Sequence, residues 1–187
     1  MTADLKMTRA ARRILDTASE LFYRRGITPV GVDLIASEAG VTKKTIYDRF
    51  GSKDNLIMAY LRERDDRWRA LVERHIAAAP DARAAVVAVF DSLATWRRDG
   101  ADRGCAMVNA RAELSAPGHP SRALAADQKQ WLLARFADLL AAAGIPHARG
   151  KAVELLLLHE GALVMADVGQ VDDAVDRARE AARRIVA

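Results

Sequence analysis

GVDLIASEAGVTKKTIYDRFGSK, residues 31–53, is the stretch that decides the fold. Apolar residues recur at helical spacing on both sides of Gly40, so each half has one face to bury. These residues are Ile35, Ala36 and Ala39 in the first half, and Ile46 and Phe50 in the second. Gly40 can take the left-handed conformation that ends many helices, and Thr42 is a suitable N-cap for the next one. The spacing therefore predicts two short helices joined by a tight turn, a helix-turn-helix.

The second predicted helix leaves outward a face rich in hydrogen-bond donors and cations. It carries Thr42, Lys43, Lys44, Thr45, Tyr47, Asp48 and Arg49. A helix is narrow enough to enter the major groove of DNA, where such side chains reach base edges and phosphates. The pattern favours a DNA reader, although an ordinary bundle corner joined through glycine has the same spacing.

The flanking residues favour the first of these two interpretations. Residues 8–26 predict an amphipathic helix that ends at Gly26 and covers the pair. Its apolar stripe consists of Ile14, Leu15, Ala18, Leu21 and Phe22. After the second helix, Gly51 is a stop, Ser52 an N-cap and Asp54 a first-turn acid that suits the dipole of a further helix. The flanks thus agree with a DNA-reading module.

Four runs in this region match a known pattern in order and spacing. They are LFYRRG at 21–26, I-A-x-x-A-G-V from Ile35 to Val41, I-Y-x-x-F from Ile46 to Phe50, and S-K-D-x-L from Ser52 to Leu56. Over residues 8–62 the chain resembles the TetR family of bacterial one-component repressors. The resemblance implies that the helix beginning near Thr42 enters the major groove and that the protein works as a homodimer. It also implies phosphate contacts from Tyr47 and Lys53.

One position departs from the family's pattern. The family usually has Thr or Ser just before its second helix, where the hydroxyl caps the helix and contacts phosphate, whereas this chain has Val30 and Gly31. Glycine is an acceptable N-cap, only about a few tenths of a kcal/mol worse than serine. We therefore expect the helix to form but do not assign that phosphate contact.

The excess positive charge lies wholly in the same part of the chain. Residues 1–62 hold 11 Lys or Arg against 7 Asp or Glu, whereas residues 63–187 hold 18 of each. A basic module that neutralises phosphates releases condensed counterions, which is the electrostatic footprint of polyanion binding. Charge alone fits a basic solvated surface equally well, and the helix-turn-helix pattern is what favours DNA.

The sequence of 187 residues predicts an all-α fold. Half of the residues are apolar (51%), alternating β-branched runs are missing, and Gly and Pro fall mostly between helical segments. We expect about nine helices, with a three-helix helix-turn-helix DNA-binding domain over 1–52 and a helical-bundle domain for effector binding and dimerisation over 53–187. The later helices are expected at 53–79, 81–99, 104–114, 121–143, 148–168 and 172–185, the last with Asp172 as N-cap.

The sequence indicates no membrane association. No segment reaches 18 uninterrupted apolar residues, and the N-terminus has no apolar stretch before its first basic cluster. We therefore expect neither a membrane span nor a signal peptide, and a cytoplasmic location. The single cysteine, Cys105, fits a reducing compartment.

The run VELLLLHEGALVM, from Val153 to Met165, is apolar on more than one face. In a small bundle such a helix has to be buried on both sides, which predicts contact with a partner chain. The resemblance points the same way, because TetR-like proteins dimerise through their last two long helices. A symmetric dimer reads two half-sites of a near-palindromic operator in double-stranded DNA. The alternative is the central core helix of a monomer.

The second domain is expected to hold a small-molecule pocket. Cys105, Asn109 and Glu113 are spaced four apart and would share one face of a short helix. Turned inward, that face could bind the polar atoms of an effector; turned outward, it is merely solvated. The remaining candidates are Trp96, Met107, Trp131 and Phe136 as apolar walls, which could equally be plain core, and His159, for which a core or interface position is the commoner reading.

Enzymatic and metal-binding chemistry finds little support. Cys105 has no histidine near it in sequence, and the four histidines are scattered. Glu113, His119 and His159 could meet at a metal only through the fold, because no HxxxH, HxH or CxxC spacing is present. No glycine-rich phosphate loop occurs. We expect no catalysis, no metal and no cofactor.

Together these features predict a homodimeric transcriptional regulator, which we interpret as a repressor that leaves its operator when an unknown small-molecule effector binds. The residues predicted for groove or base-edge contacts are Lys43, Lys44, Thr45 and Arg49. Two alternatives stay open: a DNA-binding regulator that needs no ligand, and a helical enzyme or metal-binding protein.

Overall fold

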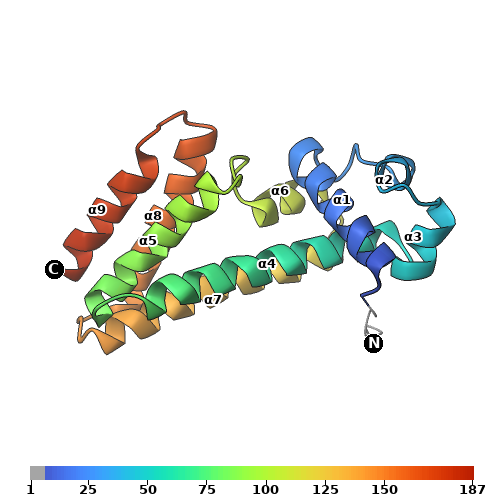
Figure 1. Cartoon of the computed structure of the whole chain (residues 1–187). Coiled ribbons are helices and arrows are strands. Elements are labelled where there is room, and N and C mark those ends of the chain that lie inside the picture. Colours follow the sequence, from blue (N-terminus) through green and yellow to red (C-terminus); the bar gives the residue numbers. More distant parts are fainter. Residues whose placement is uncertain (1–6) are drawn as a thin grey trace. The chain divides into compact units, whose positions relative to one another are not determined.

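A computed structural model describes residues 7–187 of the chain. Within this range the chain forms nine α-helices and no strand, which confirms the all-α prediction (Figure 1). The helices are α1 (Arg9–Arg25), α2 (Val32–Glu38), α3 (Lys43–Phe50), α4 (Lys53–Ala77), α5 (Ala82–Arg98), α6 (Ala106–Glu113), α7 (Ser121–Ala142), α8 (Ala148–Asp167) and α9 (Ala174–Val186). The first six residues, which we assign from sequence to the DNA-reading domain, lie outside the described part.

The chain divides into two compact units. Among the described residues, unit 1 comprises residues 7–64 together with Ala106–Ala125, and unit 2 comprises Asp65–Cys105 together with Ala126–Ala187. The long helices α4 and α7 each begin in unit 1 and continue into unit 2. The compact units therefore differ from the two domains that we predict on either side of residue 52. Unit 1 extends to Arg64, and it also includes α6 and the start of α7.

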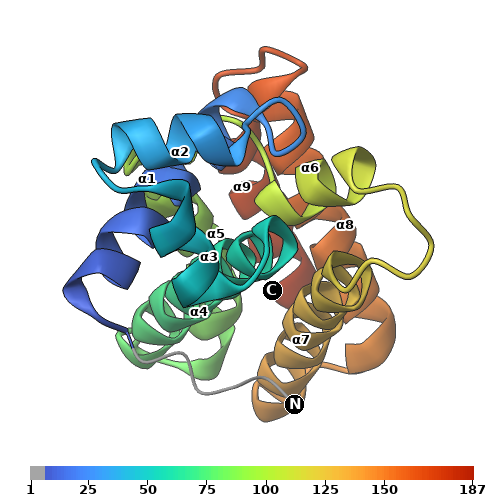
Figure 2. The same cartoon turned by 90° about the vertical axis from the view of Figure 1, so that its right-hand side faces the viewer.

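In unit 1, α1, α2 and α3 pack against one another around an apolar core (Figures 1 and 2). The predicted stripe of α1 is buried in full, and α2 and α3 each bury two apolar side chains. These buried residues are Ile14, Leu15, Ala18, Leu21 and Phe22 of α1, Ile35 and Ala36 of α2, and Ile46 and Phe50 of α3. Full burial of one large apolar side chain contributes about 1.5–3 kcal/mol. The two short helices are therefore held by packing against α1.

Capping groups set where the short helices begin and end. Gly31 is the N-cap of α2 and makes no side-chain hydrogen bond, as the sequence predicts. Gly40 follows α2 with a φ of 59°, in the left-handed region. Thr42 Oγ1 accepts a hydrogen bond from Thr45 N at 3.1 Å as the N-cap of α3. Ser52 caps α4 through its hydroxyl in the same way. The turn chemistry expected from the sequence is confirmed.

The core of unit 2 lies among α5, α8 and α9, with side chains of α4 and α7 completing it. Helix α9 packs on both α5 and α8. Phe90 of α5 and Phe136 of α7 are fully buried, and their ring centroids lie 5.9 Å apart. No helix in residues 7–187 has the length and apolar character needed to cross a membrane.

The boundaries of the later helices fall within two residues of the predicted ranges, but one predicted cap is wrong. Helix α9 begins after Asp173, and Asp172 is not its N-cap. The carboxylate of Asp173 does not cap a backbone N–H, because it pairs with Arg177 one turn along the helix. An ion pair within the first turn thus replaces the expected side-chain cap.

We predict that Gly40→Ala destabilises the protein without a steric clash. A Cβ at this position would meet nothing within 4 Å, so the cost comes from the left-handed backbone alone. That cost is about 1–2 kcal/mol, or a fall in Tm of roughly 2–8 °C for a chain of this size. Thermal unfolding followed by circular dichroism measures it. Gly40→Asn is the matched control and should recover part of the loss, because asparagine tolerates this conformation better than alanine.

Candidate nucleic-acid interface

Helix α3 carries the candidate DNA-contacting surface of unit 1. Ile46 is fully buried and Phe50 is 3% exposed, so these two side chains anchor the inner side of the helix. Their burial sets the rotation of α3 about its own axis, which leaves the remaining positions on the outward side. Of the residues predicted to face outward, Thr45 is half-buried, and the exposed ones are Thr42, Lys43, Lys44, Tyr47, Asp48 and Arg49. The structure therefore brings the predicted DNA-contacting residues of α3 together outside the core.

Two of these exposed cations pair with neighbouring carboxylates. Lys44 Nζ lies 2.8 Å from Asp48 Oδ2, one turn along α3. Lys43 pairs with Asp33 of α2. Exposed ion pairs of this kind stabilise a protein by only about 0–1 kcal/mol. Phosphate oxygens could therefore replace Asp33 and Asp48 as partners at little cost in stability.

Lys53, the predicted phosphate contact at the start of α4, has a partner inside unit 1. Its ammonium donates to the backbone oxygen of Ile27 at 2.8 Å and lies 6.0 Å from the ring centroid of Phe22. Burial lowers the pKa of Lys53 against the opposing charges of Asp54 and Glu113. Lys53 thus holds the turn between α1 and α2, a role that no local sequence pattern indicates. Its phosphate contact stays a prediction.

The predicted effector-pocket residues are divided between the two units. Met107, Asn109 and Glu113 belong to unit 1, where Met107 is buried and Asn109 is exposed. Cys105 belongs to unit 2 and precedes α6, so the expected stripe of three polar residues on one helix is wrong. The helix starts too late for that stripe because Gly104, with a φ of 64°, still belongs to the preceding loop. Glu113 instead accepts hydrogen bonds from backbone N–H groups of unit 1.

The other four pocket candidates lie in unit 2. Phe136 and His159 are buried, whereas Trp96 and Trp131 are half-buried. Trp96 packs edge-on against Trp68, with ring centroids 5.7 Å apart. All four side chains belong to the core of unit 2 or pack against it. Their part in an effector pocket stays a prediction.

A polar cluster lies against this aromatic core, formed by Cys105, Lys129, His159 and Glu160. Lys129 Nζ donates to Glu160 Oε1 at 2.8 Å and to Cys105 Sγ at 3.4 Å. Burial alone would raise the pKa of the Glu160 carboxyl, but the hydrogen bond with His159 and the charge of Lys129 lower it to about 2. Sequence reasoning missed Lys129 and Glu160. For Glu160 the available signal was its charge inside the apolar run from Val153 to Met165, and for Lys129 there was none.

His159 is the most buried member of this cluster. Burial lowers its pKa against the hydrogen bond and charge of Glu160. Its Nδ1 lies 3.2 Å from Glu160 Oε1, and its ring centroid lies 5.6 Å from that of Trp68. Its Nε2 has no hydrogen-bond partner among the residues that the structure describes. In the same part of the chain, no group of three or more His, Cys, Asp or Glu side chains is placed to hold a metal ion.

Known proteins share both the sequence pattern and the fold. A family model described as bacterial regulatory proteins of the tetR family matches residues 14–60. The solved structure of SCO4454, a TetR-family transcriptional regulator from Streptomyces coelicolor, superposes with a TM-score of 0.89 at 34% sequence identity. That similarity covers 95% of this chain and 94% of the other. The match therefore extends over both compact units.

Two further proteins extend the comparison. A putative TetR transcriptional regulator from Streptomyces avermitilis superposes with a TM-score of 0.76 at 27% identity, covering 94% of this chain and 98% of that one. The HTH-type transcriptional activator FasR of Mycolicibacterium smegmatis is 38% identical over 94 residues, which is 47% of this chain and 43% of FasR. The chain thus spans less than half the length of the curated relatives that it matches.

We predict opposite effects on DNA affinity for Lys44→Gln and Asp48→Asn. Both residues are exposed and paired with each other, so neither change disturbs the core. Lys44→Gln should weaken DNA binding and reduce the slope of the logarithm of the binding constant against the logarithm of the salt concentration by about 1. Asp48→Asn should strengthen binding to every duplex. Fluorescence anisotropy across a salt series measures both. Arg74→Gln, which removes an exposed cation of unit 2, is the control. If the Lys44 variant and the control show the same salt slope, Lys44 does not contact DNA.

Proposed function

Because the chain belongs to the TetR family of bacterial transcriptional regulators, we propose that it is a homodimeric repressor of a near-palindromic operator. In this proposal a small-molecule effector binds unit 2 and releases the DNA. The observation that carries the proposal is the outward side of α3, polar and cationic beside the buried anchors Ile46 and Phe50. The activity is binding without catalysis, needs no cofactor, and belongs in the cytoplasm, where bacterial DNA lies.

Within α3 the side chains divide by chemistry. The cations and hydroxyls near its start and end, Lys43, Lys44, Thr45 and Arg49, are suited to base edges in the major groove. Tyr47, exposed at 47%, is suited to a backbone phosphate. Two copies of α3 related by a two-fold axis would then read half-sites one helical turn of DNA or more apart.

Helix α8 supports the dimer, because it is apolar on two sides. Its inner side is buried in unit 2 and includes Leu155 and Leu163. Its other side is exposed, with Leu157 at 67% and Val168, just beyond the helix, at 77%. The exposed stripe consists of Val153, Leu157, Gly161, Val164 and Val168, which recur every three or four residues. An exposed apolar stripe of this length is typical of a surface that another chain covers.

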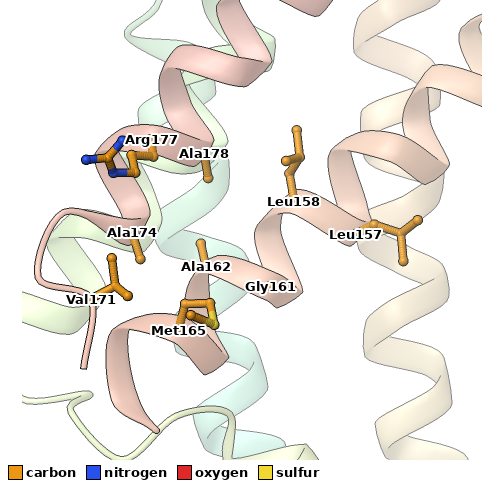
Figure 3. A pocket seen from close by; sticks show the side chains of 9 residues that line it. All are labelled: Leu157, Leu158, Gly161, Ala162, Met165, Val171, Ala174, Arg177 and Ala178. Carbon is orange, nitrogen blue, oxygen red and sulfur yellow. The ribbon is translucent and has the colours of Figure 1, made fainter. Parts of the chain in front are cut away.

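A groove between α8 and α9 opens beside this stripe (Figure 3). Its lining is apolar except for Arg177 and includes Leu157 and Gly161 of the stripe, together with Met165 of α8 and Ala174 of α9. Because a two-fold contact places the same patch on both subunits, one apolar face can cover its own copy. These features support dimerisation through the last two helices.

The polar cluster of unit 2 supports the proposed effector site. A neutral imidazole whose Nδ1 donates to a carboxylate presents Nε2 as an acceptor, and Nε2 of His159 has no partner among residues 7–187. An effector with a hydrogen-bond donor and an apolar body would satisfy that atom beside Trp68 and Phe90. We propose that release follows from a shift between two dimer arrangements, with α4 as the lever because it runs from unit 1 into unit 2.

The first test is recovery of bound DNA from sheared genomic fragments at near-physiological salt, followed by sequencing. We expect a near-palindromic site upstream of one or a few genes. Transcription in vitro from such a promoter gives the sign of regulation: repression is expected, and stimulation would favour activation, the role named for the partial relative FasR. Uniform recovery of all fragments, lost as salt rises, would contradict an operator-specific regulator.

The dimer prediction is tested with Leu157→Glu in the full chain. The side chain is mostly exposed in one copy, so the change should alter the free energy of unfolding of the monomer by no more than about 0.5 kcal/mol. Sedimentation should show loss of the dimer, because a carboxylate would be buried between apolar faces. Ala126→Glu on α7, an exposed position that receives the same charge, should stay dimeric. A dimer that survives in the Leu157 variant would place the interface elsewhere.

A further inference from the structure

Glu113, the last residue of α6, is hydrogen-bonded to the turn between α1 and α2, which is far away in sequence. Its Oε2 accepts hydrogen bonds from Ile27 N at 2.7 Å and from Thr28 N at 2.8 Å. Both N–H groups belong to the turn between α1 and α2, which leads directly to Gly31, the N-cap of α2. Hydrogen bonds from backbone N–H groups to a charged acceptor are among the stronger ones in proteins. The carboxylate therefore holds this turn in place.

Local helix physics does not account for a glutamate at this position. The C-terminus of a helix carries partial negative charge, so a carboxylate in the last turn of α6 is unfavourable for that helix. Gly26 at the end of α1 leaves room for it: with a φ of 88°, a Cβ there would stand only 3.1 Å from Glu113 Oε2. The close approach of the carboxylate to the turn thus depends on both residues.

Lys53 holds the same turn from its other side. Its Nζ donates to Ile27 O at 2.8 Å, while Ile27 N donates to Glu113. The backbone N–H and C=O groups of Ile27 are thus both hydrogen-bonded to side chains, those of Glu113 and Lys53. The side chain of Ile27 is itself 3% exposed and belongs to the core of unit 1. We name this arrangement of Glu113, Ile27, Thr28 and Lys53 the turn clasp. It joins α6, the α1–α2 turn and the start of α4.

Two of the three joined segments continue into unit 2. Helix α6 is preceded by Cys105 of unit 2, the segment after it returns to unit 2 at Ala126, and α4 crosses at Asp65. We infer that Glu113 is a positioning residue of the DNA reader, which sets the pose of α2 and α3 by holding the turn before them. Loss of the carboxylate would open the clasp and weaken operator binding, although Glu113 lies on α6 and outside α2 and α3. This inference rests on the proposed function for its main readout.

The test compares Glu113→Gln with Glu20→Gln in the full chain. Both changes remove one negative charge from unit 1, and Glu20 is an exposed residue of α1 that pairs only with its helix neighbour Arg24 in the contacts described. Charge alone predicts slightly tighter DNA binding for both variants. The clasp predicts that the Glu113 variant binds the operator about ten-fold more weakly than the Glu20 variant, since an amide replaces the charged acceptor. Binding to unrelated duplexes and the salt slope should match in the two variants.

Hydrogen exchange supplies a readout that does not depend on DNA. In the unaltered protein the amides of Ile27 and Thr28 should be protected, and exchange at these amides and across α2 and α3 should be faster in the Glu113 variant. If the Glu113 and Glu20 variants bind the operator with affinities that agree within about two-fold, the inference is overturned. Unprotected amides of Ile27 and Thr28 in the unaltered protein would overturn it even if the variant fails to fold. If the unaltered protein selects no operator, the proposed function fails, but the clasp can still be tested by hydrogen exchange. In that case, exchange across α2 and α3 that is the same in the Glu113 variant as in the unaltered protein would overturn the clasp.

Discussion

An isolated helix of eight residues is not stable in water, so α3 depends on tertiary packing for its existence. Burial of Ile46 and Phe50 against the rest of unit 1 supplies that packing and at the same time sets which side of the helix faces outward. Helix α1 also holds the turn before α3, because Arg13 donates to the backbone oxygen of Gly40 at 3.0 Å. The position of every proposed DNA-contacting side chain on α3 follows from these contacts.

The two surfaces through which the chain is proposed to meet other molecules use the same geometry with opposite chemistry. Helices α3 and α8 each have one side buried in their own unit and one side left outward. On α3 the outward side is polar and cationic, which suits a phosphate backbone in water. On α8 it is apolar, which suits a second copy of the chain, because water is released when two such faces meet. In both helices the buried residues fix the rotation of the helix about its axis and so determine which side chains face outward.

The sequence predicted most of the fold because helical period and capping are local properties. Apolar spacing, glycine turns and hydroxyl caps located the helices of the described chain to within two residues at each end. The errors lie where a residue's partner decides its role. Asp173, whose carboxylate pairs with Arg177, stands at the N-cap of α9 in place of the predicted Asp172, and Gly104, in the left-handed region, belongs to the loop that precedes Cys105 and α6. Neither pairing nor loop conformation can be read from periodicity.

By itself, the sequence determined the all-helical fold, the helix-turn-helix and the outward side of α3, since each depends on residues only a few positions apart. The tertiary structure alone decided that Glu113 and Lys53 hold the turn at Ile27, and that Lys129 meets Glu160 and His159 inside unit 2. Glu113 and Ile27 are 86 positions apart, and Lys129 and Glu160 are 31 apart. Such contacts depend on how separate helices pack against one another, and no period along a single helix records that arrangement.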